Sequence, residues 1–142
     1  MATTHGGRSR DFDWKVRDKI LVIESESGMH HEYSLREILS IIRVLRLAFG
    51  KRWIPLANNV EKMYSGTEKE GLGTTIYALK PGDTMHAQGA SYLGVVLERA
   101  KIFEWNGKKK GIAWRFRNDV DDIASLERML KRAKPRINRE IE

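Results

Sequence analysis

The sequence predicts a small α/β protein of the α+β type, with helices and short antiparallel strands along one chain of 142 residues. Two observations predict this class. Apolar residues recur at helical spacing over residues 34–49 and 84–100. Two strand-like runs within residues 101–116 flank a turn that contains Asn106 and Gly107. Hydrophobic residues make up 41% of the chain and charged residues 32%, as expected for a globular protein with an apolar core.

The N-terminal third is expected to contain a tail, a hairpin and a helix. Residues 1–10 offer nothing to bury, which predicts a disordered tail. Runs at residues 19–24 and 29–33, separated by a turn signal, predict a β-hairpin. In the helix at residues 34–49, Ser34 and Glu37 have the spacing of a capping box. Apolar side chains surround most of this helix, so we expect it to be the central helix of the domain or half of a dimer interface.

Three helices are expected in the middle of the chain. The first covers residues 52–66, with Pro55 tolerated in its first turn. A solvated loop follows, and a short helix over residues 74–80 ends before Pro81 and Gly82. The next helix begins at residue 84 or 85 and runs to about residue 100. Its core-facing positions follow the spacing i, i+3, i+4 and i+7: Leu93, Val96, Leu97 and Ala100.

A hairpin and a final helix complete the chain. Strands at residues 101–105 and 112–116 flank a turn with three consecutive lysines. Trp105, Trp114 and Phe116 alternate with polar residues and are expected to cover the core, while the alternative is stacking on nucleobases. The segment 118–135 predicts a helix with acidic residues in its first turn and basic residues in its last, as the helix dipole favours.

Residues 53–117 resemble a winged helix-turn-helix domain. The resemblance lies in a short helix, a Pro-Gly turn, a longer helix ending in YLGVVLERA, and the hairpin KIFEWNGKKKGIAWRF. It implies a winged-helix fold for these residues, which the expected N-terminal hairpin and helix at residues 11–52 and the expected C-terminal helix and tail at residues 118–142 would extend. Gly89 and Gly94 depart from the pattern, because each costs about 1 kcal/mol relative to alanine inside a helix.

The resemblance implies two groups of DNA-contacting residues. On the helix that would read DNA, Gln88 and Arg99 are expected to contact base edges, and Ser91 and Tyr92 to contact phosphates. On the hairpin, or wing, the basic side chains would neutralise phosphates. These are Lys108, Lys109, Lys110 and Arg115. The alternatives are a solvated helix face and a hairpin tip that lysines keep soluble.

Composition and motifs limit the other functions. The net charge of +7 favours a polyanionic partner. The absence of cysteine excludes disulfides and thiolate sites. His30 and His31 lie near Glu24 and Glu26, but adjacent residues of a strand point to opposite faces and cannot easily share a metal. We therefore expect no metal, no cofactor and no enzymatic activity. No signal peptide or membrane span is recognisable, so we expect a cytoplasmic protein.

The expected function is sequence-dependent binding of double-stranded DNA by a transcriptional regulator. A winged-helix module for protein–protein interaction or assembly is the alternative, and a metal-dependent nuclease is a third. The helix at residues 34–49 and the C-terminal helix offer more apolar surface than one small winged domain needs to cover. This predicts a homodimer, which suits a two-fold symmetric DNA site. The competing interpretation is that the two helices pack on each other within one subunit.

Overall fold

Four antiparallel strands near the N-terminus form the first of two sheets in this computed structural model, which describes residues 1–133. The sheet order is β1-β2-β3-β4, and the strands are β1 (Ala2–Thr3), β2 (Asp11–Arg17), β3 (Ile20–Ser25) and β4 (His30–Ser34). The predicted hairpin is β3–β4. The prediction that residues 1–10 form a disordered tail is wrong, because β1 pairs with β2 and Ala2 is fully buried.

Helix α1 (Leu35–Phe49) follows the first sheet; it begins one residue after its predicted start and ends at the predicted residue. The Ser34 hydroxyl accepts a hydrogen bond from the Glu37 N–H at 3.0 Å, which caps the helix as the sequence indicates. Gly50 closes the helix with a φ of 57°. Helix α1 contacts β4, α3 and α6, so its apolar surface is covered on more than one side within the chain.

The predicted helix at residues 52–66 is only partly present. Its first part is the short strand β5 (Ile54–Pro55), and helix α2 is confined to Val60–Ser65. The helix begins late because the Asn59 side chain caps it, accepting a hydrogen bond from the Lys62 N–H. Helix α3 (Leu72–Leu79) starts two residues before its predicted position, and Leu72 is fully buried.

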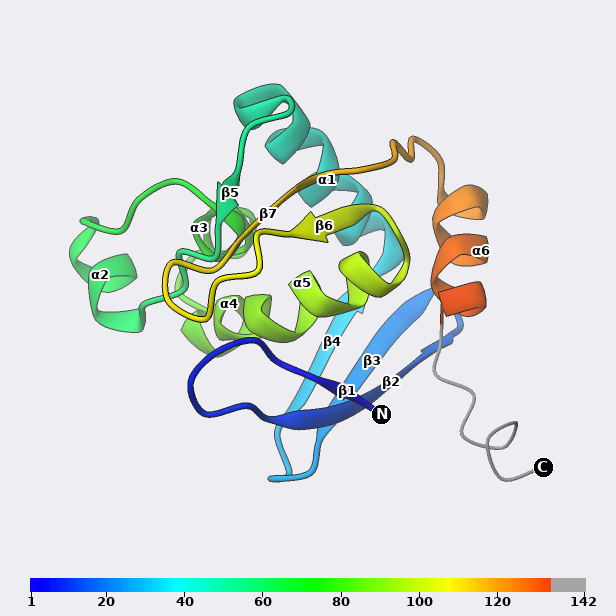
Figure 1. Ribbon diagram of the computed structural model, residues 1–142, viewed down its shortest axis with the longest axis horizontal. Coiled ribbons are helices and arrows are strands. Elements are labelled where there is room, and N and C mark those ends of the chain that lie inside the picture. Colours follow the sequence, from blue (N-terminus) through cyan, green and yellow to red (C-terminus); the bar gives the residue numbers. More distant parts are fainter. Residues whose placement is uncertain (134–142) are drawn as a thin grey trace.

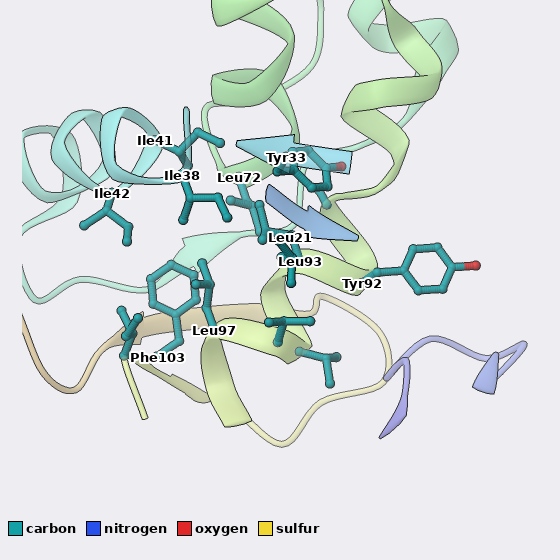
Figure 2. Close-up of a cluster of buried hydrophobic side chains, with 14 of the residues drawn as sticks. Leu21, Tyr33, Ile38, Ile41, Ile42, Leu72, Tyr92, Leu93, Leu97 and Phe103 are labelled. Atoms are coloured by element: carbon teal, nitrogen blue, oxygen red, sulfur yellow. The ribbon is translucent and has the colours of Figure 1, made fainter. Parts of the chain in front are cut away.

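The long helix predicted to begin at residue 84 is broken into α4 (Thr84–Gln88) and α5 (Ala90–Arg99), with Gly89 between them. The predicted core positions of α5 are confirmed as buried. Figure 1 shows α5 at the centre of the molecule, with the four-stranded sheet on one side and the second sheet on the other. Figure 2 shows Leu93 and Leu97 among the buried side chains of α1 and Phe103.

The second sheet has the order β5-β7-β6 and contains the predicted hairpin, β6 (Phe103–Trp105) and β7 (Ala113–Phe116). Helix α6 (Ile123–Ala133) then packs on α1 and α5 through the buried Leu126 and Leu130. The helices α1 and α6 therefore pack on each other within one subunit. Buried residues of all these segments belong to a single hydrophobic core.

Candidate nucleic-acid interface

The turn between β6 and β7, residues 106–111, is held by its own hydrogen bonds. The Asn106 side chain accepts a hydrogen bond from the Lys108 N–H at 3.1 Å and donates one to the Gly111 carbonyl at 2.9 Å. The Trp105 indole N–H donates to the Lys108 carbonyl at 3.2 Å. Gly107 and Gly111 have φ values of 78° and 72°, in the left-handed region that glycine adopts without strain. The turn is thus an ordered support for the side chains at its tip.

The three lysines of this turn, Lys108, Lys109 and Lys110, are all exposed. Among residues 1–133, no carboxylate forms an ion pair with any of them. Three adjacent ammonium groups on one short turn produce a local positive potential that attracts phosphates and other anions. We call residues 106–111 the lysine turn.

Arg115, the fourth basic residue expected on the hairpin, is used within the protein. Its Nε donates to the Glu104 carboxylate at 2.5 Å, and its guanidinium lies 4.4 Å from the centre of the Trp53 ring. Glu104 and Arg115 face each other as cross-strand partners of β6 and β7. The charge of Arg115 is therefore balanced locally, in contrast to the charges of the lysine turn.

The N-terminal segment lies against the hairpin. The His5 ring stacks on Trp105 with centroids 3.6 Å apart and planes 3° apart, and His5 Nε2 lies 2.7 Å from the Glu98 carboxylate. A side-chain atom placed on Gly6 would lie 3.9 Å from Ile112. Arg8 follows this packed segment in the chain and is exposed, and Figure 1 shows the N-terminal loop between β1 and β2. The sequence did not indicate this contribution, because the segment was expected to be a disordered tail.

The face of α5 that was expected to meet DNA is largely covered. Tyr92 is only 5% exposed, with its ring 5.1 Å from Phe12 and 5.4 Å from His31 of the first sheet. In Figure 2 the Tyr92 side chain points away from Leu93 and Leu97. The prediction that this face is open is therefore wrong, because the four-stranded sheet packs on it.

The other residues expected on that face do not form one surface. Gln88 is exposed at the end of α4, where its carbonyl accepts a hydrogen bond from Asn58. Ser91 is half-buried, and Arg99 is exposed at the far end of α5. Helix α5, with ten residues ending at Arg99, lies between them and spans about 15 Å at 1.5 Å per residue. The structure thus places Gln88 before the start of α5 and Arg99 at its end, so the two residues do not share one helix face.

The two glycines of this region allow close packing with side chains of the protein. A side-chain atom at Gly89 would overlap the Tyr33 hydroxyl, and one at Gly94 would overlap the Trp114 ring. Trp114 is 1% exposed, so it has no room to move away. The departures at Gly89 and Gly94 are therefore explained by contacts with the two sheets on either side of α5.

A buried polar cluster joins the first sheet to α4. The Tyr33 hydroxyl donates to the His86 carbonyl at 2.6 Å, and His86 Nε2 lies 2.5 Å from Glu37. His31 is 4% exposed, and its Nε2 has no hydrogen-bond partner among residues 1–133. Burial lowers the pKa of His31, and the neighbouring His86 lowers it further. Burial also raises the pKa of Tyr33.

The strand positions of the two adjacent histidines follow the prediction, since His31 is buried while His30 is exposed. Within residues 1–133, no group of three histidine, aspartate or glutamate side chains is placed to hold a metal ion. None of the helices in the same residues is both long and apolar enough to cross a membrane. The candidate site is the basic hairpin surface, because its ordered turn presents three exposed lysines.

No family model, no curated protein and no solved structure matches the chain.

Proposed function

We propose that the chain binds double-stranded DNA, with the lysine turn as its principal contact. The observation that carries the proposal is the ordered turn with three exposed lysines that have no carboxylate partners within residues 1–133. Helix α3, helix α5 and the hairpin β6–β7 follow one another in the order that the resemblance to winged helix-turn-helix domains implies. We therefore assign the turn the role of a wing.

The proposed mode of binding differs from reading by a helix. The major groove of B-DNA admits an α-helix or a two-stranded β-ribbon. Because the first sheet covers α5, the ribbon β6–β7 is the element that can approach a groove. Lysines bind phosphates as point charges, and such contacts carry little sequence information. We propose that affinity comes mainly from the backbone and that any base preference from Gln88 or Arg99 is secondary. The proposal includes no catalytic step.

The test is a set of DNA affinities measured by fluorescence anisotropy over a salt series. Replacing Lys108, Lys109 and Lys110 by alanine should weaken binding to every duplex alike. It should also reduce the slope of log affinity against log salt by up to about 2.7, at about 0.9 for each phosphate that is no longer neutralised. Folding should be unaffected, because an exposed turn buries little surface.

A matched variant separates a site from a general effect of charge. Arg17, Arg36 and Lys51 are exposed, form no ion pair within residues 1–133, and lie outside the hairpin. Replacing these three by alanine removes the same charge as the lysine-turn variant. Equal losses of affinity in both triple variants would contradict the assignment of the turn. No binding of the unmodified chain to any duplex at low salt would contradict DNA binding itself.

A protein–protein assembly role remains the second proposal, and one observation favours it. Leu47 of α1 is 89% exposed and Val44 is 42% exposed, although the other leucine and isoleucine side chains of the helix are buried. We propose that these side chains contribute to a homodimer contact. Sedimentation at micromolar concentration should then give a dimer, and Leu47→Ser should return the mass to that of a monomer. A monomer at every concentration would remove this proposal.

A further inference from the structure

A small cavity of about 240 Å³ opens beside the base of the lysine turn. Its apolar part comes from Leu56 and Ile112, and its polar part from the loop and helix that follow β5. The Leu56 N–H donates to the Ile112 carbonyl at 3.0 Å, which joins the end of β5 to the start of the hairpin strand β7. Gly111 of the lysine turn also lines the cavity. The cavity and the turn are therefore parts of one continuous surface.

The polar groups of this cavity favour an anion. Lys62 and Lys69 both line it, are exposed, and form no ion pair within residues 1–133. Glu68 also lines it, but its two carboxylate oxygens accept hydrogen bonds from the backbone N–H groups of Asn59 and Lys69, each at 2.9 Å. These hydrogen bonds hold the Glu68 carboxylate against the backbone at the wall of the cavity. Two ammonium groups against one such carboxylate leave the cavity with a net positive charge.

The orientation of Asn59 adds a donor. Its Oδ1 accepts the hydrogen bond from the Lys62 N–H that caps α2, at 3.0 Å. Its side-chain amide nitrogen has no hydrogen-bond partner in the part of the chain that the structure describes, so it can donate to a ligand. Together with the ammonium groups of Lys62 and Lys69, this amide gives the wall three donor groups that suit the acceptor oxygens of a phosphate.

The size of the cavity limits its occupant. Pockets that enclose drug-sized ligands usually measure about 300–1,000 Å³, and a water molecule occupies about 30 Å³. A volume of about 240 Å³ is too small for most such ligands but fits a phosphate with part of its sugar. The cavity is also open at the surface and borders Gly111 of the lysine turn, so the nucleotides on either side of the bound phosphate can remain outside it.

We infer that this cavity holds a phosphodiester group of the nucleic acid strand whose neighbouring phosphates contact the lysine turn. The inference rests on the proposed function and extends it, because it assigns Lys62 and Lys69 as phosphate contacts and sets the path of the strand. The strand runs from the tip of the hairpin, past Gly111, to the loop between α2 and α3.

The test compares the double variant Lys62→Ala, Lys69→Ala with a control double variant, Arg17→Ala, Lys51→Ala. Duplex affinity is measured over the same salt series, and thermal unfolding verifies that each variant is folded. The cavity variant should lower the slope of log affinity against log salt by up to about 1.8, for two phosphate contacts. The control should leave the slope nearly unchanged. Lys62→Arg with Lys69→Arg should preserve most of the affinity, because the charges remain.

A second measurement locates the ligand. Titration of the isotope-labelled chain with inorganic phosphate, and separately with a short duplex, should shift the amide NMR signals of Asn59, Lys69 and Ile112. These shifts should disappear in the Lys62→Ala, Lys69→Ala variant.

The outcomes separate this inference from the proposed function. If the lysine-turn variant loses affinity while the cavity variant behaves as its control, the cavity inference is overturned and DNA binding stands. If the unmodified chain binds no duplex but phosphate still shifts the cavity signals, DNA binding is overturned, and with it the nucleic acid as the source of the phosphate. Shifts that persist unchanged in the cavity variant would exclude Lys62 and Lys69 as the ligand-binding groups.

Discussion

Tyr92 distinguishes a helix that reads DNA from a helix buried in the core. Its side chain is 5% exposed and packs against Phe12 with the two rings in an edge-to-face arrangement, 84° apart. If α5 read DNA, Tyr92→Ala would weaken DNA binding and leave stability nearly unchanged. In the structure the same change removes a buried aromatic ring. We therefore expect a large loss of stability and no specific loss of DNA affinity.

The expected loss of unfolding free energy follows from the surface that the Tyr92 side chain buries. An aromatic side chain in a core buries about 150–250 Å², which corresponds to about 4–6 kcal/mol at about 25 cal/mol per Å². This is an upper estimate, because the unfolded chain already buries part of its apolar surface. Replacement of large aromatic side chains in cores by alanine costs about 3–5 kcal/mol. We expect Tyr92→Ala to lower the free energy of unfolding by this amount.

Urea denaturation measures the effect. With a slope of about 2 kcal/mol per molar urea, the midpoint should fall by about 2 M. Tyr92→Phe is the matched control, since the hydroxyl makes no hydrogen bond within residues 1–133 and the ring is retained. It should change the unfolding free energy by less than about 0.5 kcal/mol. A loss below about 1 kcal/mol for Tyr92→Ala, together with weaker DNA binding, would refute the burial of this face.

The remaining predictions concern the packing around α5. Gly94→Ala should lower the unfolding free energy by about 1–3 kcal/mol, because overlap with Trp114 outweighs a gain in helix propensity of about 1 kcal/mol; a more stable variant in urea denaturation would contradict this. Because the folded-state pKa of His31 is lowered, the unfolded chain binds the proton first as pH falls. The contribution of His31 to the free energy of unfolding should therefore be fully present above about pH 6.5 and be lost as the pH falls below it. In the His31→Phe variant this loss at low pH should be absent. If the unmodified chain and the His31→Phe variant lost stability equally as the pH falls, His31 would not be the cause of this loss.

Local signals in the sequence predict much of this fold. Ser34 and Glu37 indicate the start of α1, and Gly50 indicates its end. The spacing of Leu93 and Leu97 indicates the core-facing side of α5. Each of these signals depends on residues a few positions apart, so it is visible without knowledge of the tertiary structure. The hairpin β6–β7 is predictable for the same reason.

The incorrect predictions concern residues whose contacts lie far away in the sequence. Ala2 is buried because β1 pairs with β2, and no pattern in residues 1–10 indicates that pairing. The second side of α5 depends on Phe12 and His31, which are about 60 to 80 positions away from Tyr92. Helical periodicity identifies one buried face, but it cannot show that a separate sheet covers the other. Tyr92 has an amphipathic side chain that suits either environment, so its identity alone did not decide between them.

The lysine turn differs from several other basic parts of the protein because its charges are not paired with acidic residues in the described part of the chain. Arg43 and Arg46 of α1 pair with Asp121 and Asp119, in the segment before α6, and Lys19 pairs with Glu127 of α6. These acidic residues balance basic residues on α1 and the first sheet, whereas the lysines of the turn have no such partners within residues 1–133. A positive potential therefore remains around the hairpin and falls off over about 10 Å at moderate salt. Because buried Trp114 anchors the hairpin strand while the lysines stay in solvent, changes at the turn should alter polyanion affinity without altering stability.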